Sequence, residues 1–271
     1  MIDNFYAIDY QTHSFRSHDG RASILEQCKR AVEIGLDELG LSEHKDFDPD
    51  DPMFDYFDFD AYMAEIEVAR RQFGGKLKIL AGVEIDYQIW FEDKIANYLD
   101  SHKFDFVIGS VHYVDKLMLM TPQYNRNRTK KSAYSDYFQA VSDSVKSGLF
   151  DIVGHLEYSN RRGIEAWGEF RTDDFEKELT DLFNLMIEKS IPLEINTAGL
   201  HQNLGISYPC SDTVDLYSRL GGRLLSIASD AHHPDQLAHA YSTAANLAIR
   251  NGITHVCTWK NREMTPVPLL S

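Results

Sequence analysis

Short apolar segments rich in β-branched residues alternate with longer segments whose apolar residues recur at helical spacing. The short segments predict strands at residues 5–10, 36–41, 77–84, 104–110, 151–155, 191–196, 223–229 and 253–258. The longer segments, each ending within two residues of a Gly or Pro, predict helices at residues 22–34, 59–72, 133–147, 173–190, 211–220 and 234–251. This alternation predicts a mostly parallel α/β sheet covered by helices.

The length of the chain favours a closed barrel over an open sheet. Seven or eight strands in 271 residues match the size of one α/β barrel. The sequence contains no low-complexity stretch and no Pro- or Ser-rich linker, so we expect residues 1–271 to form a single TIM-like barrel domain. A core of this size needs no disulfide bonds to be stable.

Composition narrows the range of partners. The formal net charge is −15, and an acidic surface repels nucleic-acid backbones, so we expect no nucleic-acid partner. An anionic substrate stays compatible with this charge, because bound divalent cations invert the local field. The N-terminus lacks the features of a signal peptide, and no apolar run approaches the ~18 residues of a membrane span. The three scattered cysteines are typical of reduced thiols, so we expect a cytoplasmic protein with no membrane partner.

Metal-binding residue types recur where the expected strands end. Five histidines and three acidic residues occupy such positions: His13, Asp19, His44, Glu84, His112, His155, Asp230 and His232. The carboxyl ends of barrel strands meet at one rim, where barrel enzymes keep their active sites. Buried ionisable groups are costly unless they are paired or bind metal. The pattern therefore predicts two or three divalent transition metal ions (Zn, Mn or Fe), which mixtures of imidazole and carboxylate bind.

Such a centre favours hydrolysis at phosphorus. A carboxylate is needed to bridge two metal ions ~3.5–4 Å apart. Glu84, in the middle of the series, suits that role. A metal-bridging hydroxide then attacks the phosphoryl group, and no side-chain nucleophile is required. The sequence has no GxSxG elbow and no GxxxxGKS/T loop, so serine-hydrolase and P-loop chemistry lack their motifs.

These motifs resemble those of the polymerase-and-histidinol-phosphatase (PHP) family, in particular its monofunctional histidinol-phosphate phosphatases. The resemblance covers nearly the whole chain, and its more specific parts are Gly109-Ser-Val-His112 and Glu194-Ile-Asn196-Thr. The other matching motifs are Asp9-Tyr-Gln-Thr-His13, Ser17-His-Asp19, Ser42-Glu-His44, Gly82-Val-Glu84, Gly154-His155-Leu-Glu and Ser229-Asp230-Ala-His232. The resemblance implies a distorted (β/α)7 barrel with a trinuclear metal centre.

The resemblance also implies a role for each ligand, with Glu84 shared between two metal ions. The three implied ligand sets are His13, Glu84 and Asp230; Glu84, His112 and His155; and Asp19, His44 and His232. Arg161 is similar to the arginine that meets the substrate phosphate in this family, and a guanidinium suits phosphate because it donates two parallel hydrogen bonds. Catalytic roles are thereby expected for Arg161, Glu84 and Asp230.

One position departs from the family pattern. The family opens with His-x-His, whereas this chain has Gln11 before His13. An amide oxygen is a poorer zinc ligand than imidazole and suits harder ions. With Gln11 kept as a candidate ligand, three consequences remain open. The first metal ion is held by fewer protein ligands, or the site favours Mn or another oxygen-tolerant ion, or the barrel has weakened or lost catalysis.

Neighbouring residues compete for some of these roles. His18 stands next to Asp19, and Arg162 stands next to Arg161, so each pair leaves two candidates. His201 is a candidate to bind the substrate. Four residues are candidates to select a cationic substrate through charge or an aromatic ring: Asp46, Asp48, Glu157 and Tyr158.

The resemblance implies a metal-dependent phosphomonoesterase with a small phosphorylated substrate, L-histidinol phosphate. It would release L-histidinol and phosphate in histidine biosynthesis. Two alternatives remain. One is a PHP-type phosphotyrosine-protein phosphatase or another phosphoester hydrolase, although a nuclease would need a basic groove, which the acidic composition disfavours. The other is a metal-binding barrel that has lost catalysis. The sequence makes no prediction of the oligomeric state.

Overall fold

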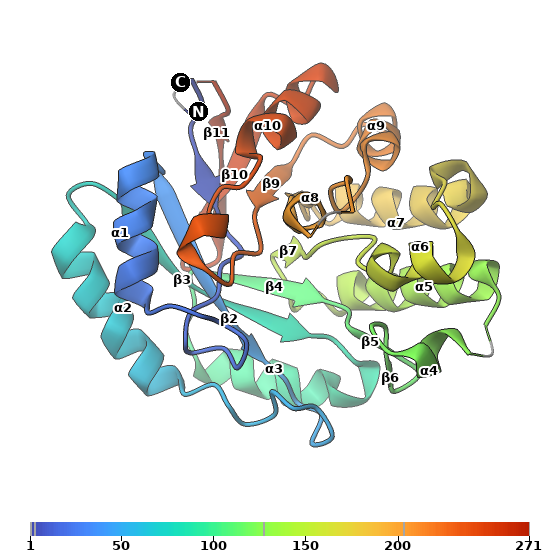
Figure 1. The fold of residues 1–271 in the computed structure, drawn as a ribbon, viewed down its shortest axis with the longest axis horizontal. Helices are drawn as coiled ribbons and strands as arrows, with labels where there is room; N and C mark the ends of the chain where they lie inside the picture. Colours follow the sequence, from blue (N-terminus) through green and yellow to red (C-terminus); the bar gives the residue numbers. More distant parts are fainter. Residues whose placement is uncertain (1, 3, 127, 203, 271) are drawn as a thin grey trace.

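A computed structural model of the chain describes residues 2, 4–126, 128–202 and 204–270. Its main sheet has seven strands, all paired in parallel, in the order β1-β2-β3-β4-β7-β8-β9 (Figure 1). These strands are β1 (Ile8–Asp9), β2 (Glu38–Lys45), β3 (Lys78–Asp86), β4 (Phe106–Ser110), β7 (Ile152–Val153), β8 (Leu193–Asn196) and β9 (Leu225–Ala228). Each corresponds to one of the segments expected from the sequence.

The first and last strands of this sheet approach each other and nearly close it into a barrel. Beyond the ends of β1 and β9, Thr12 and Ala231 form a parallel bridge. The backbone N–H of His13 donates to the carbonyl of Ala231 at 2.8 Å. Asp9 accepts 2.8 Å and 2.5 Å hydrogen bonds from the backbone N–H and hydroxyl of Ser229. The expected distorted (β/α)7 barrel is therefore confirmed.

Helices surround the barrel (Figure 1). They are α1 (Ile24–Ile34), α2 (Phe59–Phe73), α3 (Glu92–Ser101), α4 (Pro122–Asn125), α5 (Lys130–Ser147), α6 (Asn160–Trp167), α7 (Glu176–Glu188), α8 (Ala198–His201), α9 (Ser211–Arg219) and α10 (Tyr241–Arg250). Local sequence sets several of their ends. The Ser23 side chain accepts from the backbone N–H of Glu26 in a capping box, and Gly35 ends α1 with φ of 81°. Within the described ranges, no helix has the length and apolar character of a membrane span.

The expected strand at 253–258 does not join the parallel sheet. It forms β10 (His255–Lys260), which pairs antiparallel with β11 (Glu263–Pro268). The two residues between them, Asn261 and Arg262, have φ of 50° and 66°, as a tight hairpin turn requires. Arg262 also binds Asp151, just before β7, through its guanidinium at 2.9 Å. The hairpin therefore covers the amino-terminal end of the barrel.

The expected helix at 234–251 begins late. Residues Pro234–Gln236 form a 3-10 turn, and α10 starts only at Tyr241. Between them, Ala238 and Ala240 have φ of 51° and 53°, which a continuous right-handed helix excludes. The backbone N–H of Ala238 instead donates to Asp9 Oδ2 at 2.8 Å. A long-range hydrogen bond has thus taken the place of the first helical turns.

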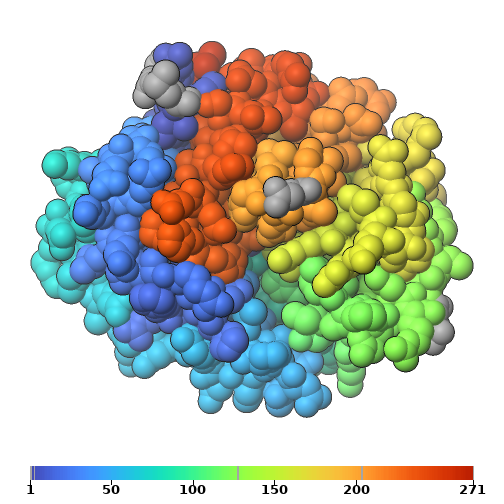
Figure 2. All heavy atoms as spheres, in the orientation of Figure 1, coloured from blue at the N-terminus to red at the C-terminus, as the bar shows by residue number. Residues whose placement is uncertain are grey.

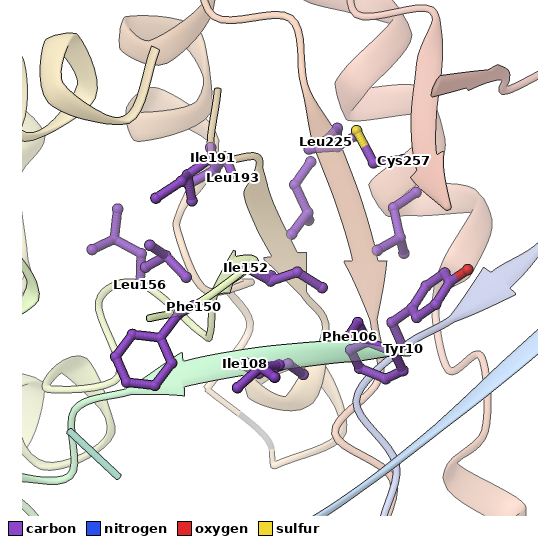
Figure 3. Close-up of a cluster of buried hydrophobic side chains, with 14 of the residues drawn as sticks. Tyr10, Phe106, Ile108, Phe150, Ile152, Leu156, Ile191, Leu193, Leu225 and Cys257 are labelled. Atoms are coloured by element: carbon purple, nitrogen blue, oxygen red, sulfur yellow. The ribbon is translucent and has the colours of Figure 1, made fainter. Parts of the chain in front are cut away.

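Aromatic and aliphatic side chains fill the barrel near its amino-terminal end (Figure 3). Tyr10 packs edge-on against Phe106, with ring centroids 5.0 Å apart, and against Trp259 of the hairpin at 5.1 Å. Gly40 and Gly82 make room for the Phe106 ring, because a Cβ at either position would lie 2.7 Å or 2.2 Å from its Cζ atom. This packing leaves buried polar groups concentrated toward the carboxyl ends of the strands.

Candidate metal centre

Most of the predicted ligands lie at the carboxyl ends of successive strands. His44 and Glu84 are register partners near the ends of β2 and β3. His112, His155 and Asp230 each stand two residues past the ends of β4, β7 and β9. Because the strands are parallel and neighbouring, their ends bring these five side chains to one rim.

His13 and Asp19 reach the same rim from the loop that follows β1. Glu43 fixes this loop, since its carboxylate accepts 2.6 Å hydrogen bonds from the hydroxyls of both Ser14 and Ser17. The Ser17 hydroxyl also accepts from the backbone N–H of His44 at 2.9 Å. Glu43 was not among the residues predicted from the sequence. Its place inside the Ser-Glu-His motif, between a strand residue and a ligand, was the available signal.

Glu84 lies between two groups of histidines. Its Oε1 is 3.0 Å from His155 Nε2 and 3.7 Å from His112 Nε2. Its Oε2 is 3.3 Å from His13 Nε2 and 3.5 Å from His44 Nδ1. Each carboxylate oxygen thus faces a different pair of imidazoles, which is the arrangement that a bridging carboxylate needs.

The first group consists of Glu84, His112 and His155, whose ligand atoms all lie within 4.8 Å of one another. The two Nε2 atoms are 3.2 Å apart. Two ligand atoms of a tetrahedral zinc ion, each about 2.1 Å from the metal, lie about 3.4 Å apart. The spacing of these three side chains therefore fits one divalent transition metal ion.

The second group consists of His13, His44 and His232, whose ring nitrogens also lie within 4.8 Å of one another. The His13 ring stacks on both neighbours, with centroids 4.3 Å and 4.4 Å apart. Two carboxylates adjoin this group. Asp230 Oδ1 is 3.3 Å from His13 Nε2, and Asp19 Oδ2 is 3.1 Å from His232 Nε2.

Several buried polar atoms at this rim have no hydrogen-bond partner. They include His13 Nε2, Glu84 Oε2 and Asp19 Oδ1. His13 and Glu84 are 0% and 1% exposed, so water does not solvate these atoms freely. An unsatisfied buried polar group costs roughly 1–3 kcal/mol. Unpaired nitrogen and oxygen atoms that converge in this way fit bound cations.

The protonation states of His112 and Glu84 also fit metal binding. Burial lowers the pKa of His112 to about 3, which keeps the imidazole neutral. Burial alone would raise the pKa of Glu84, but the surrounding imidazoles, His44 first among them, hold it well below its ordinary value. Neutral imidazole and ionised carboxylate are the forms that bind metal ions.

Two of the candidate ligands have unusual backbone conformations. His155 has φ of 22° and Asp230 has φ of 55°. Non-glycine residues seldom occupy this region, and such strain clusters at functional sites. The backbone N–H of His155 donates to the buried carboxylate of Glu194 at 2.8 Å, which helps to hold that conformation.

Gln11 is buried and is engaged away from the other candidate ligands. Its Oε1 accepts a 2.8 Å hydrogen bond from Asn196 Nδ2, and its Nε2 has no partner. Gln11 does not line the cavity at the rim, whereas seven of the other predicted ligands do so. His13, fully buried, contacts four of those seven, because it lies 3.3 Å from Glu84 and Asp230 and stacks on His44 and His232.

The structure shows which residue of each neighbouring pair lies at the cavity. Arg161 lines the cavity and donates to the Tyr158 hydroxyl at 3.0 Å, whereas Arg162 points outward and pairs with Glu165. Asp19 lines the cavity, whereas the exposed His18 packs against the ring of Tyr56.

Some of the candidates for substrate binding line the cavity and others do not. His201 lies outside the residues that line the cavity, with its Nε2 3.1 Å from the carbonyl of Ser229. Asp46 and Tyr158 line the cavity, but Asp48 does not. Glu157 is fully buried elsewhere, where it accepts from the backbone N–H of Cys210 at 2.9 Å.

The rim is built from segments that are far apart in the sequence. In Figure 2 the blue amino-terminal segment lies beside the orange-red segment that carries His232. The backbone N–H of Arg21 donates to the carbonyl of His232 at 2.8 Å and joins the two.

Known proteins are similar to this chain in sequence and in fold. A model of the PHP domain family matches residues 9–198. A probable histidinol-phosphatase of Deinococcus radiodurans is 26% identical over 253 residues, which cover 89% of this chain and 92% of that protein. A histidinol-phosphatase of Lactococcus lactis subsp. lactis is 28% identical over 231 residues, which cover 83% and 84%. A similar crystal structure is that of a histidinol phosphate phosphatase from Lactococcus lactis subsp. lactis, complexed with zinc, L-histidinol and phosphate. It aligns with this chain with a TM-score of 0.87 and 25% sequence identity. The alignment covers 96% of this chain and 99% of that chain.

Proposed function

The chain belongs to the PHP domain family, and from this premise we propose that it is a metal-dependent phosphomonoesterase that hydrolyses L-histidinol phosphate to L-histidinol and phosphate. The observation that carries this proposal is the near-complete alignment with a histidinol phosphate phosphatase that binds zinc, L-histidinol and phosphate. The convergence of two groups of histidines on Glu84 supports it independently, because a phosphatase of this kind needs a bridging carboxylate.

In this proposal three ligand sets hold the metal ions. They are His13, Glu84 and Asp230; Glu84, His112 and His155; and Asp19, His44 and His232. Divalent ions such as Zn, Mn or Fe, when bound, lower the pKa of coordinated water and neutralise charge on phosphoryl oxygens. The spacing and the unpaired atoms of these side chains fit such ions, although the donor set does not select one metal.

The protein's own groups position the reaction. The Ser110 hydroxyl donates to Glu84 Oε1 at 2.6 Å and so restrains the carboxylate between the two histidine groups. Asp86 Oδ1 lies 3.6 Å from His112 Nδ1, which leaves Nε2 directed at Glu84. Arg161 binds the phosphoryl group of the substrate, because it is the arginine of the cavity lining and its guanidinium suits phosphate oxygens.

Steady-state assays test the function. The chain, loaded separately with zinc, manganese or iron, is assayed for phosphate release from L-histidinol phosphate, from other small phosphate esters and from a phosphotyrosine peptide. We expect the highest kcat/KM with L-histidinol phosphate. A preference for another ester would reject the substrate but keep the reaction class. Metal binding without turnover of any ester would instead support a barrel that has lost catalysis.

A cytoplasmic location forms part of the proposal. The three cysteines, Cys28, Cys210 and Cys257, are free thiols, as is usual in a reducing compartment. The phosphotyrosine-protein phosphatase alternative is not favoured, because the two relatives described above are named as histidinol-phosphatases.

A further inference from the structure

A cluster of acidic residues adjoins the candidate metal ligands. Asp46 directly follows β2, and Asp51 lies further along the same loop. They are 4% and 8% exposed and line the same cavity as Glu84. Asp86, at the end of β3, is 4% exposed and lies against His112. The loop after β2 carries Asp46 and Asp51, and Asp86 ends the neighbouring strand β3, which explains why the acids gather at one part of the rim.

These acids differ in whether the chain supplies hydrogen-bond donors to them. Asp86 accepts from the backbone N–H of His112 at 2.6 Å and from Gln88 Nε2 at 2.9 Å. Asp51 accepts from the backbone N–H of Met53 at 2.6 Å. Asp46 Oδ2, in contrast, is buried and has no hydrogen-bond partner. An unpaired, buried carboxylate oxygen in a cavity wall is a binding position for a donor that the chain itself does not supply.

Among the described residues, no lysine or arginine forms an ion pair with this cluster. In the described ranges Asp86 pairs only with His112, and neither Asp46 nor Asp51 forms an ion pair. The neighbouring Lys45 directs its Nζ over the rings of Phe47 and Tyr98, at 5.3 Å and 5.6 Å. The carboxyl groups of this wall are therefore left without a cationic partner from the part of the chain that the structure describes.

The geometry favours an organic cation over another metal ion. The two metal-type groupings among the described residues are the histidine clusters around Glu84, and the three aspartates do not gather closely enough to form a third. The side chains of Met53 and Met118 add apolar surface to the same cavity lining. Carboxylates beside apolar surface suit an ammonium group carried on a carbon skeleton or ring.

The phosphate-binding arginine lies on a different part of the barrel. Arg161 belongs to α6, after β7, whereas Asp46 and Asp51 follow β2, and β3 and β4 separate these strands in the sheet. The cavity lining thus carries positive charge at one place and negative charge at another. Such a cavity matches a substrate with a phosphate at one end and a protonated amine at the other.

We propose that Asp46 and Asp51 form the subsite that binds the ammonium group of the substrate. This assignment rests on the proposed function, since L-histidinol phosphate carries both a phosphate and an amine. Asp46 contributes its unpaired oxygen as the acceptor, and Asp51 contributes a second charge on the same wall. The subsite makes the enzyme specific for aminoalkyl phosphates without taking part in the attack on phosphorus.

The test compares two substrates in the metal-loaded enzyme. Asp51→Asn preserves the shape of the side chain, and Asp50→Asn, at an exposed neighbouring position, is the matched control. For L-histidinol phosphate we expect Asp51→Asn to lower kcat/KM roughly 10- to 100-fold, mainly through KM, because one charged contact is lost. For p-nitrophenyl phosphate, which has no amine, we expect less than about a twofold change.

A binding measurement separates recognition from catalysis. L-Histidinol should inhibit p-nitrophenyl phosphate hydrolysis, with an inhibition constant raised in Asp51→Asn and in Asp46→Asn but not in Asp50→Asn. Equal losses on both substrates, or an unchanged inhibition constant, would overturn the subsite while leaving the proposed function intact. A wild-type chain that hydrolyses p-nitrophenyl phosphate but not L-histidinol phosphate would overturn the proposed function and this assignment with it.

Discussion

The side-chain amide of Asn196 donates a 2.8 Å hydrogen bond to Gln11 Oε1 inside the barrel. The orientation of Asn196 is fixed, because its Oδ1 accepts from the backbone N–H of Ala198 at 2.9 Å and its Nδ2 also donates to Glu194 at 3.1 Å. The amide oxygen of Gln11 is therefore engaged, and the free atom is Nε2, which has no lone pair for a metal ion.

This relationship leads to a prediction for Gln11→His. A histidine at this position restores the second imidazole of the family motif, so we expect more metal bound per chain after dialysis against a weak chelator. Mass spectrometry of the metal content measures this. Gln11→Ala is the control, and we expect its metal content to equal that of wild type. A loss of metal in Gln11→Ala would mean that the Gln11 oxygen is a ligand after all.

Removal of metal should destabilise the protein more at high pH than at low pH. Burial would lower the pKa of His13, but Asp230 and Glu84 raise it well above its ordinary value in the metal-free chain. The stabilisation from protonated His13 is complete below the unfolded pKa of ~6.5 and is lost as the pH rises through the folded pKa. Metal binding has the opposite trend, because it requires neutral imidazole.

Thermal unfolding with and without chelator, at pH 5.5 and pH 8, measures this difference. We expect the gap in Tm between metal-loaded and chelated protein to be wider at pH 8. Equal gaps at the two pH values would show that proton release from His13 is not linked to metal binding.

Asp9→Asn should weaken the seam that closes the barrel. The two Asp9 oxygens accept from the backbone N–H and hydroxyl of Ser229 and from the backbone N–H of Ala238. An Asn amide places an NH2 group against one of these donors, so we expect a loss of roughly 1–3 kcal/mol in the free energy of unfolding. Urea denaturation measures the loss.

Asp37→Asn is the matched control for this seam. The exposed Asp37 accepts from the backbone N–H of Ala7 through one oxygen, at 2.7 Å, and an Asn can keep that bond. We expect a change in the free energy of unfolding below about 0.5 kcal/mol. Similar losses in both variants would contradict a special role for Asp9.

Arg161→Lys should weaken binding of the phosphate end of the substrate. A lysine keeps the charge but cannot donate two parallel hydrogen bonds, so we expect kcat/KM to fall roughly 10-fold and inhibition by inorganic phosphate to weaken similarly. Arg162→Lys, at the outward-facing neighbour, should match wild type in both assays. If the two variants behave alike, the guanidinium of Arg161 does not bind phosphate.

Much of the local architecture followed from the sequence. The Ser23 capping box and Gly35 bound α1 within two residues of the expected range, because capping depends on atoms only a few residues apart. The strands β2 and β3 were also expected, since apolar runs are local patterns, but they end at Lys45 and Asp86 rather than at residues 41 and 84, so that His44 lies within β2 and not after it.

Tertiary contacts decided what local patterns left open. The segment around Trp259 reads as one more strand of the sheet, but the turn at Asn261 and the packing of the ring on Tyr10 make it a hairpin. Residues 234–240 have helical spacing, but the hydrogen bond from Ala238 to Asp9 bends them into turns. Neither interaction is visible in the sequence, because the partners lie far apart along the chain.

The features of the site likewise fall into those that the sequence predicted and those that only the structure showed. The sequence alone determined which residue types lie at the ends of the strands, because that pattern depends only on residues close together in the chain. Only the folded chain decided that Arg161 rather than Arg162 lines the cavity, that Glu43 fixes the first loop, and that the oxygen of Gln11 faces Asn196. The physical reason is that strand propensity and capping act over a few residues, whereas the direction of a side chain at the rim is set by barrel closure and by buried hydrogen bonds between distant segments.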